Sequence, residues 1–248
     1  MIYNMPEYWL MKNAELTEPY LTFSSPSSFT LAVNDATKRW DGTLEYSTDA
    51  SAWSTWDGTT TLSSATSGSD NVLYLRGIGN TVITRSNPSS KWVLTGSDIA
   101  CIGNIENLLD YATVESGAHP TMADYCYRGM FNGCTALTQV PALPATTLAA
   151  GCYYAMFQNC TALTQAPALP ATTLAVDCYN SMFFGCTGLK LSATQTGEYT
   201  VAYRIPPSGT GTTATNALAY MFFITGGTFT GTPEINKTYY LSNTNTIV

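Results

Sequence analysis

Charged residues are scarce in this chain. Lys, Arg, Asp and Glu together make up 11 % of its 248 residues, against about 25 % in an average globular protein. The ten Lys and Arg are scattered, and the formal net charge is −7. Because binding to nucleic acid or to an anionic membrane surface needs clustered cations, we expect neither function. The surface must consist mainly of Thr, Ser, Asn, Gly and Tyr, which suits contact with glycans or with other proteins.

Long apolar runs and an export signal are also missing. No stretch of about 18 uncharged apolar residues occurs, so no transmembrane helix and no membrane insertion are predicted. The opening MIYNMPEYWLMKNAELTEPY lacks the basic region, the apolar region and the cleavage site of a secretory signal. The expected surface composition suits an extracellular protein, yet the sequence shows no secretory signal. Either the signal was trimmed away, or the protein leaves the cell by lysis, as a virus particle does. We interpret residues 1–19 as an anchoring arm or as an extra edge strand.

Catalytic patterns are missing as well. His119 is the only histidine and has no nucleophile motif beside it, so we interpret it as a structural or surface residue. The segment DNVLYLRGIGN holds only G-x-G, which predicts a hairpin turn rather than a phosphate loop. Carboxylates that could hydrolyse glycans are scattered, namely Asp57, Asp70, Glu106, Asp110, Glu115, Asp124 and Asp177. We predict a protein that is not an enzyme and has no cofactor, and keep a glycan-active enzyme as the third alternative.

What the chain does contain is a tandem repeat, in which Cys126, Cys152 and Cys178 each begin a unit. Residues 126–151 read CYRGMFNGCTALTQVPALPATTLAAG and residues 152–177 read CYYAMFQNCTALTQAPALPATTLAVD, with 7 differences in 26 positions. The third unit begins CYNSMFFGCTGLK at 178–190 and then diverges. A fixed period of about 20–30 residues is typical of a solenoid, because one unit cannot bury its apolar face alone.

The spacing inside each unit predicts a short helix followed by an extended segment. Cys126, Met130, Phe131 and Cys134 have helical spacing and would share one face, and the prolines of PALPATT keep that stretch extended or turned. We predict a repeat core made of Cys126, Met130, Phe131, Cys134, Leu137, Leu143, Leu148, Cys152, Met156, Phe157, Cys160, Leu163, Leu169, Leu174, Cys178, Met182 and Cys186.

Both ends of the array differ from the full units, as capping repeats do. Residues 217–248 form the predicted C-terminal cap, in which ALAYMFFITGGTFTGTP is a degenerate unit and TYYLSNTNTIV an edge strand. On the other side, SDIACIGNIENLLDYATV at 97–114 predicts a strand and a short helix as the N-terminal cap. Its apolar positions are Ile99, Ile102, Ile105, Leu108 and Leu109.

Six of the seven cysteines recur in the repeat with C-x7-C spacing. Zinc sites normally use two to four intervening residues, so no metal site is expected. Disulfides within a unit would need close Cα atoms, which a sequence does not show. Because free cysteine is commonly a small buried residue, we favour buried thiols over three disulfides.

Residues 20–96 read differently. Seven short β-rich runs, separated by turn signals, are YLTFSS, SFTLAV, GTLEYST, TTTLSS, NVLYLRG, NTVIT and KWVLTG. Their number and spacing predict an immunoglobulin-like β-sandwich. The cysteine pair of an antibody domain is absent, since the first cysteine is Cys101.

The repeat motif resembles a known family. The pattern M-F-x-x-C-T-x-L followed by P-x-L-P-A-T-T-L resembles the BspA-like leucine-rich repeats of surface proteins from gut and oral bacteria and of their phages. The likeness covers about residues 98 to 240 and implies a leucine-rich repeat domain over 97–248 that serves adhesion or surface binding. The segment LEYSTDASAWSTW resembles small sandwich modules that precede such repeats. The expected fold is mainly β with short helices, an immunoglobulin-like sandwich followed by a short capped solenoid.

Aromatic residues are the candidates for binding. They either form an exposed row that stacks on sugars or proteins, or pack in the core and between repeats. The candidates are Trp53 and Trp56 near sandwich turns, the recurring Tyr127, Tyr153 and Tyr179, and the neighbouring Arg128 and Tyr154.

These patterns predict a non-enzymatic, surface-exposed virion component of a phage of gut bacteria, either a decoration or a fibre protein. Its expected place is extracellular, on the virion surface, and its expected partners are other virion proteins or a cell-surface protein or glycan. The alternative is a secreted bacterial adhesin at the cell surface. A homo-oligomer, such as the trimer of a fibre, is compatible with the sequence.

Overall fold

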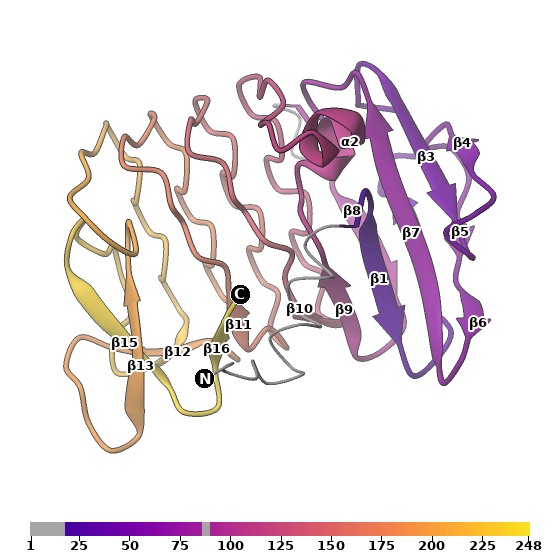
Figure 1. Ribbon diagram of the computed structural model, residues 1–248. Coiled ribbons are helices and arrows are strands. Elements are labelled where there is room, and N and C mark those ends of the chain that lie inside the picture. The colour runs from indigo at the N-terminus through magenta and orange to yellow at the C-terminus, as the bar shows by residue number, and fades with distance from the viewer. Residues whose placement is uncertain (1–17, 86–89) are drawn as a thin grey trace, which may run out of the picture.

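The computed structural model describes residues 18–85 and 90–248, so the predicted arm at 1–19 lies almost wholly outside the described residues. The chain is mainly β, as predicted, with the short helix α2 (Asn107–Glu115). Figure 1 shows sheets at one end of the molecule, a series of stacked coils in the middle, and a further small sheet at the C-terminal end.

Two sheets make up the N-terminal end. The larger has the order β10 (Leu137–Gln139), β9 (Ile99–Ile102), β1 (Leu21–Ser25), β7 (Asp70–Ile78), β3 (Thr43–Ser47) and β4 (Ser54–Trp56), with β6 (Ala65–Ser67) also on β7. The smaller has the order β5 (Leu62–Ser63), β2 (Thr30–Val33) and β8 (Trp92–Thr95). All pairs are antiparallel except β9 with β10.

The two sheets pack through alternate side chains, because successive residues of a strand point to opposite faces. On β1, Phe23 is fully buried. Its ring lies 6.4 Å from that of Trp92 on β8, and Trp92 lies 5.6 Å from Trp56 on β4. The core between the sheets is therefore centred on aromatic rings.

The strand pairing partly follows the immunoglobulin pattern. The pairs β2–β5 and β3–β7 match the B–E and C–F pairs of that fold. However, β1 pairs with β7 and β8 pairs with β2, so the first and last strands have exchanged sheets. The predicted strand NTVIT does not form. Its residues Ile83 and Thr84 instead donate their N–H groups to the carbonyl of Cys126 in the first coil.

The repeats stack as four equivalent coils, residues 126–134, 152–160, 178–186 and 217–225. The N–H of Tyr127 donates to the carbonyl of Cys152 at 2.8 Å, Tyr153 to Cys178 at 3.0 Å, and Tyr179 to Ala217 at 2.9 Å. The predicted helix in each unit is wrong. Within a coil the intervening residues make turns of i to i+3 type, as from Met130 to Tyr127.

Backbone geometry explains why a helix does not form. A residue with positive φ recurs every four positions, at Tyr125 just before the first unit and at Gly129 and Gly133 within it. Such residues interrupt an α-helix, which needs negative φ throughout. The side chains nevertheless point inward as predicted, because every predicted repeat-core residue is buried except Leu148, which is half-buried and packs against the core.

Elements form in both segments that were predicted to cap the array, but their positions differ from the prediction. The strand and helix at 97–114 appear as β9 and α2, but β9 pairs with β1 and β10 and so joins the sheets to the coils. The predicted edge strand TYYLSNTNTIV is also wrong. Its strand β15 (Thr238–Ser242) lies inside a sheet ordered β13 (Tyr199–Arg204), β15, β12 (Lys190–Ser192) and β14 (Gly226–Gly227). The last strand, β16 (Thr246–Ile247), pairs in parallel with β11 (Gln165–Ala166).

Candidate binding surface

An aromatic cluster lies on the face of the larger sheet that is turned away from the smaller sheet. On β7, Leu73 and Leu75 are buried while Tyr74 and Arg76 alternate with them and reach the other face. We call the group Tyr20, Trp53, Tyr74, Arg76 and Tyr111 the Trp53 cluster. Its members come from β7, from the residues just before β1 and β4, and from α2.

The guanidinium group of Arg76 holds the Trp53 cluster together. Its Cζ lies 4.0 Å from the centre of the Trp53 ring and 4.4 Å from that of Tyr111. Its Nε donates to Oε2 of Glu45 at 2.8 Å, and the two residues are directly opposite across β3 and β7. Cation–π contacts and an ion pair on one side chain fix the orientation of the two rings.

Two further rings extend this surface. The ring of Tyr20 lies 5.7 Å from that of Trp53 and 5.1 Å from that of Tyr74. Burial, together with the nearby Glu18 carboxylate, raises the pKa of Tyr20 to about 12. The hydroxyl therefore stays protonated at neutral pH. Half-buried rings of this kind offer a flat apolar area with polar groups at its margin.

The position of Tyr111 depends on a close approach between α2 and β7. Gly77 contacts the carbonyl of Leu108, which a Cβ atom at position 77 would approach to 1.7 Å. Only glycine leaves room for the helix here. Because α2 lies against β7, Tyr111 can reach Arg76.

A second aromatic group lies on the outside of the first two coils. The guanidinium of Arg128 lies 4.8 Å from the ring centre of Tyr154 and 5.4 Å from that of Tyr125. All three residues are half-buried. The structure thus brings the predicted candidates Arg128 and Tyr154 together at the surface.

Four other predicted binding residues are buried, and this corrects the prediction that they bind a ligand. Trp56, Tyr127, Tyr153 and Tyr179 are each at most 1 % exposed. The three tyrosines form a column with ring distances of 5.5 and 5.8 Å. Equivalent positions of successive units lie next to one another in the stack, so each tyrosine ring packs against the tyrosine ring of the neighbouring coil.

The cysteines are buried free thiols, as expected. The thiol of Cys160 donates to the carbonyl of Phe131 at 3.1 Å, and that of Cys186 donates to Phe157 at 2.9 Å. Each thiol thus donates a hydrogen bond to the preceding coil, which gives cysteine the same role at this position of each unit. Within the described part of the chain, no three His, Cys, Asp or Glu side chains gather as metal ligands would.

His119 pairs with a carboxylate that the sequence did not connect with it. Nδ1 of His119 lies 2.7 Å from Oε2 of Glu106. Burial raises the pKa of Glu106, against the opposing effect of His119. A hollow of about 310 Å³ lies beside the pair and is also lined by Met122 and Leu148. One carboxylate and one imidazole form a polar contact between the residue that precedes α2 and the loop that follows it.

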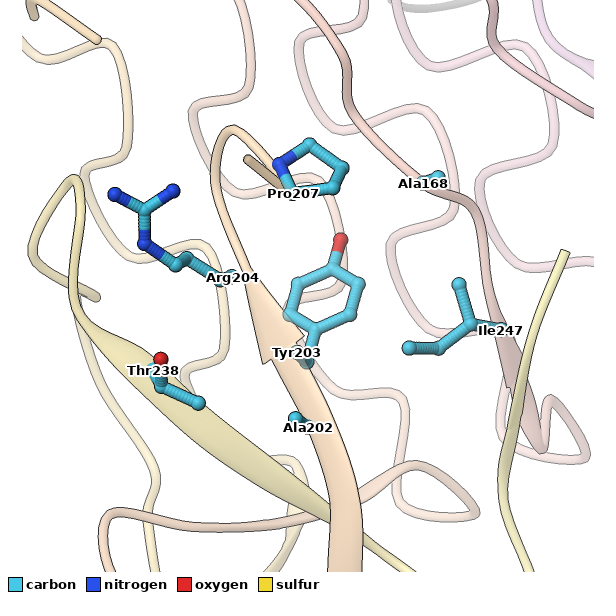
Figure 2. A pocket seen from close by; sticks show the side chains of 7 residues that line it. All are labelled: Ala168, Ala202, Tyr203, Arg204, Pro207, Thr238 and Ile247. Carbon is cyan, nitrogen blue, oxygen red and sulfur yellow. The ribbon is translucent and has the colours of Figure 1, made fainter. Parts of the chain in front are cut away.

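Figure 2 shows a smaller hollow of about 170 Å³ at the C-terminal end, with Tyr203 at its centre, Arg204 to one side and Ile247 to the other. Its polar groups are used within the fold. The Tyr203 hydroxyl donates to the carbonyl of Pro167 at 3.1 Å, and Arg204 donates to the carbonyls of Pro206, Gly209 and Asn236. The hollow therefore offers mainly apolar contact.

The chain matches no protein-family model, no curated protein and no solved structure. None of the helical segments in residues 18–85 and 90–248 has the length and apolar character that crossing a bilayer requires. Of the Trp53 cluster, the sequence had indicated Trp53 alone. The alternation of β7 could have pointed to Tyr74 and Arg76, whereas Tyr20 and Tyr111 reach the cluster only through tertiary packing.

Proposed function

We propose that this protein binds and assembles rather than catalyses, as a surface-exposed virion component of a phage of gut bacteria, either a decoration or a fibre protein. Its partners are a glycan or protein of the cell surface and other virion proteins. The observation that carries the binding role is the Trp53 cluster, in which aromatic rings are held in place on the outer face of a sheet. The assignment to a virion is supported by the resemblance of the repeat to BspA-like units.

The proposal includes the finer class of the fold. The coils are a short BspA-like leucine-rich repeat domain, supported by the M-F-x-x-C-T-x-L motif and by units that stack in register. The N-terminal sheets are a variant of the immunoglobulin-like sandwich, supported by the β2–β5 and β3–β7 pairs. The exchange of β1 and β8 between sheets is the departure from that class.

The Trp53 cluster suits the apolar face of a sugar ring. Stacking on a fixed ring costs little side-chain entropy, because Arg76 and Tyr20 already hold Trp53. The Arg76 donors that Glu45 leaves unused and the Tyr20 hydroxyl supply hydrogen bonds for sugar hydroxyls at the margin. A surface of this size binds weakly per site, so many copies on one particle would add avidity.

A glycan array probed with the purified protein tests the binding role. Trp53→Ala should weaken binding to any positive glycan by about tenfold or more, which is a loss of about 1.4 kcal/mol. Tyr240→Ala removes a half-buried aromatic side chain from β15, at the other end of the molecule (Figure 1), and should leave binding unchanged. Equal binding by the wild type and Trp53→Ala would refute the assignment of this surface.

Location separates the virion proposal from its alternative. Immunogold electron microscopy on lysates and intact cells of the source culture should place the protein on phage-like particles. Gold on the cell envelope would instead identify a bacterial adhesin that uses the same surface. Loss of the gene without any loss of intact virions bearing the other structural proteins would also count against an essential structural role.

A further inference from the structure

The stack of coils is polar. In every backbone hydrogen bond between the repeated coils the earlier coil donates its N–H and the later coil accepts with its carbonyl, as from Tyr127 to Cys152 and from Ser181 to Ala219. The donors recur at every second residue. At the first coil the preceding segment bonds three of the accepting carbonyls, because Ile83 donates to Cys126, the Thr84 hydroxyl to Arg128 and Trp92 to Met130. The acceptor end is therefore largely covered.

The donor end lies at the last coil, residues 217–225. The carbonyls of Thr215, Ala217 and Phe223 accept bonds from the third coil. In a planar trans peptide the N–H points opposite to the carbonyl. The N–H groups of Asn216, Leu218 and Ile224 therefore point away from the stack.

The chain closes only the middle of this edge. The N–H of Tyr220 donates to Oγ1 of Thr232 at 2.9 Å, and Phe222 donates to the carbonyl of Gly231 at 2.9 Å. Among the residues that the structure describes, no group accepts from the N–H of Asn216, Leu218 or Ile224. Leu218 is buried, whereas Asn216 and Ile224 are exposed. An unpaired N–H in a buried residue is costly, so an acceptor for Leu218 would be stabilising, and water can serve the other two donors.

A groove and an apolar surface flank the open donors. The groove has a volume of about 510 Å³ and runs between Asn216–Ala219 and Thr232–Ile235. In the same coil, Tyr220 is 55 % exposed and Ile224 54 %. The residues equivalent to Tyr220 in the second and third coils, Ala155 and Ser181, are only 5 % and 9 % exposed. The last coil thus exposes a position that the inner coils cover.

We propose that this edge is a docking site for an extended apolar segment of a partner protein, which lies in the groove and whose backbone carbonyls bond Asn216 and Leu218. Asn216 and Leu218 are two residues apart, the spacing at which one coil bonds the next, and alternate carbonyls of an extended peptide match it. Apolar side chains of that segment cover Tyr220, Phe223 and Ile224. The proposal does not depend on the Trp53 cluster or on glycan binding.

Hydrogen-bond polarity argues against a symmetric pair of these edges. In a two-fold dimer the same surface meets itself, so donors would face donors. The acceptor end of another copy is already occupied by Ile83 and Trp92. A foreign segment with free carbonyls is the occupant that the edge fits.

Site-specific photo-crosslinking tests the proposal. p-Benzoylphenylalanine at position 220, incorporated in the source culture, should crosslink to one defined peptide of a second protein, identified by mass spectrometry. That peptide, made synthetically, should bind the purified full chain and slow amide hydrogen exchange at Asn216 and Leu218. Thr213→Trp fills the groove margin and should weaken peptide binding about tenfold or more. Thr172→Trp, at another exposed position that does not line the groove, should not.

Both variants must retain the wild-type unfolding temperature, so that a loss of binding reports on the groove. Crosslinks only to residues 1–17 of the same chain, or only to another copy, would overturn the choice of occupant. No crosslink in cells or particles, or equal binding by Thr213→Trp, would overturn the docking site itself. None of these results bears on glycan binding at Trp53, so failure of either proposal can be told from failure of the other.

Discussion

Two stacked tyrosines at the same repeat position should respond oppositely to loss of their hydroxyl groups. The Tyr127 hydroxyl donates to the carbonyl of Ile105 at 3.1 Å. The Tyr153 hydroxyl is buried and has no partner among the described residues. We therefore expect Tyr127→Phe to destabilise the fold and Tyr153→Phe to stabilise it.

The magnitudes follow from what each hydroxyl does. Tyr127→Phe loses a hydrogen bond with a net value of about 1 kcal/mol and leaves the Ile105 carbonyl short of a donor, for a total loss of about 1–2 kcal/mol. Tyr153→Phe removes an unpaired buried polar group, whose desolvation costs about 1–3 kcal/mol. Phenylalanine keeps both rings, so the stacking at 5.5 Å is common to the two variants and cancels in the comparison.

Urea unfolding followed by fluorescence measures both changes. With an unchanged slope, a shift of the midpoint reports stability directly. In thermal unfolding each kcal/mol should move the transition by about 2–4 °C for a chain of this length. If Tyr153→Phe lost as much stability as Tyr127→Phe, the Tyr153 hydroxyl would have a hydrogen-bond partner in solution and the reasoning would be refuted.

Three further predictions concern the core and the helix. Burial raises the pKa of Glu106 above its usual 4.5, so the wild type should lose stability as pH rises from 4.5 through that raised pKa. Glu106→Gln should therefore gain relative to the wild type between about pH 4 and pH 7 in thermal unfolding, and a constant difference would contradict this. Because burial raises the pKa of all seven thiols, a thiol reagent at about pH 8 should label the native chain slowly and seven groups in denaturant; about one would indicate disulfides. Gly77→Ala should destabilise by about 2 kcal/mol and weaken glycan binding, since its Cβ would lie 1.7 Å from the Leu108 carbonyl; wild-type stability in urea would show that α2 can shift freely.

The repeat made the core of the coils predictable, because a position that recurs in every unit must meet the same environment in each coil. Its secondary structure was not predictable by spacing. Residues three and four apart share a face in a helix, but they also do so in a coil that turns every four residues. Positive φ at Gly129 is a familiar glycine role, whereas its equivalents Ala155 and Ser181 carry no such signal in the sequence.

The rest depended on contacts between distant segments. Trp53 was recognisable as a candidate, but Arg76 meets it only because β3 pairs with both β4 and β7. Tyr111 reaches Arg76 only because α2 lies against β7. The interior position of β15 depends on β12 and β13, which lie where the repeat diverges and its pattern no longer guides assignment. Trp53 and Trp56 lie three residues apart on and beside one short strand, and the face that the second sheet covers decides which of them is exposed.

Polarity links the two halves of the molecule. A stack in which every coil donates forward has two unlike ends, one needing donors and one needing acceptors. The N-terminal half supplies the donors through Ile83, Thr84 and Trp92, and β9 and β10 join the same two halves in one sheet. The N-terminal half therefore covers the acceptor end of the stack and also contains the Trp53 cluster. At the donor end, only the N–H groups of Tyr220 and Phe222 have acceptors within the described chain. A partner can therefore bind there without breaking any hydrogen bond within the repeats.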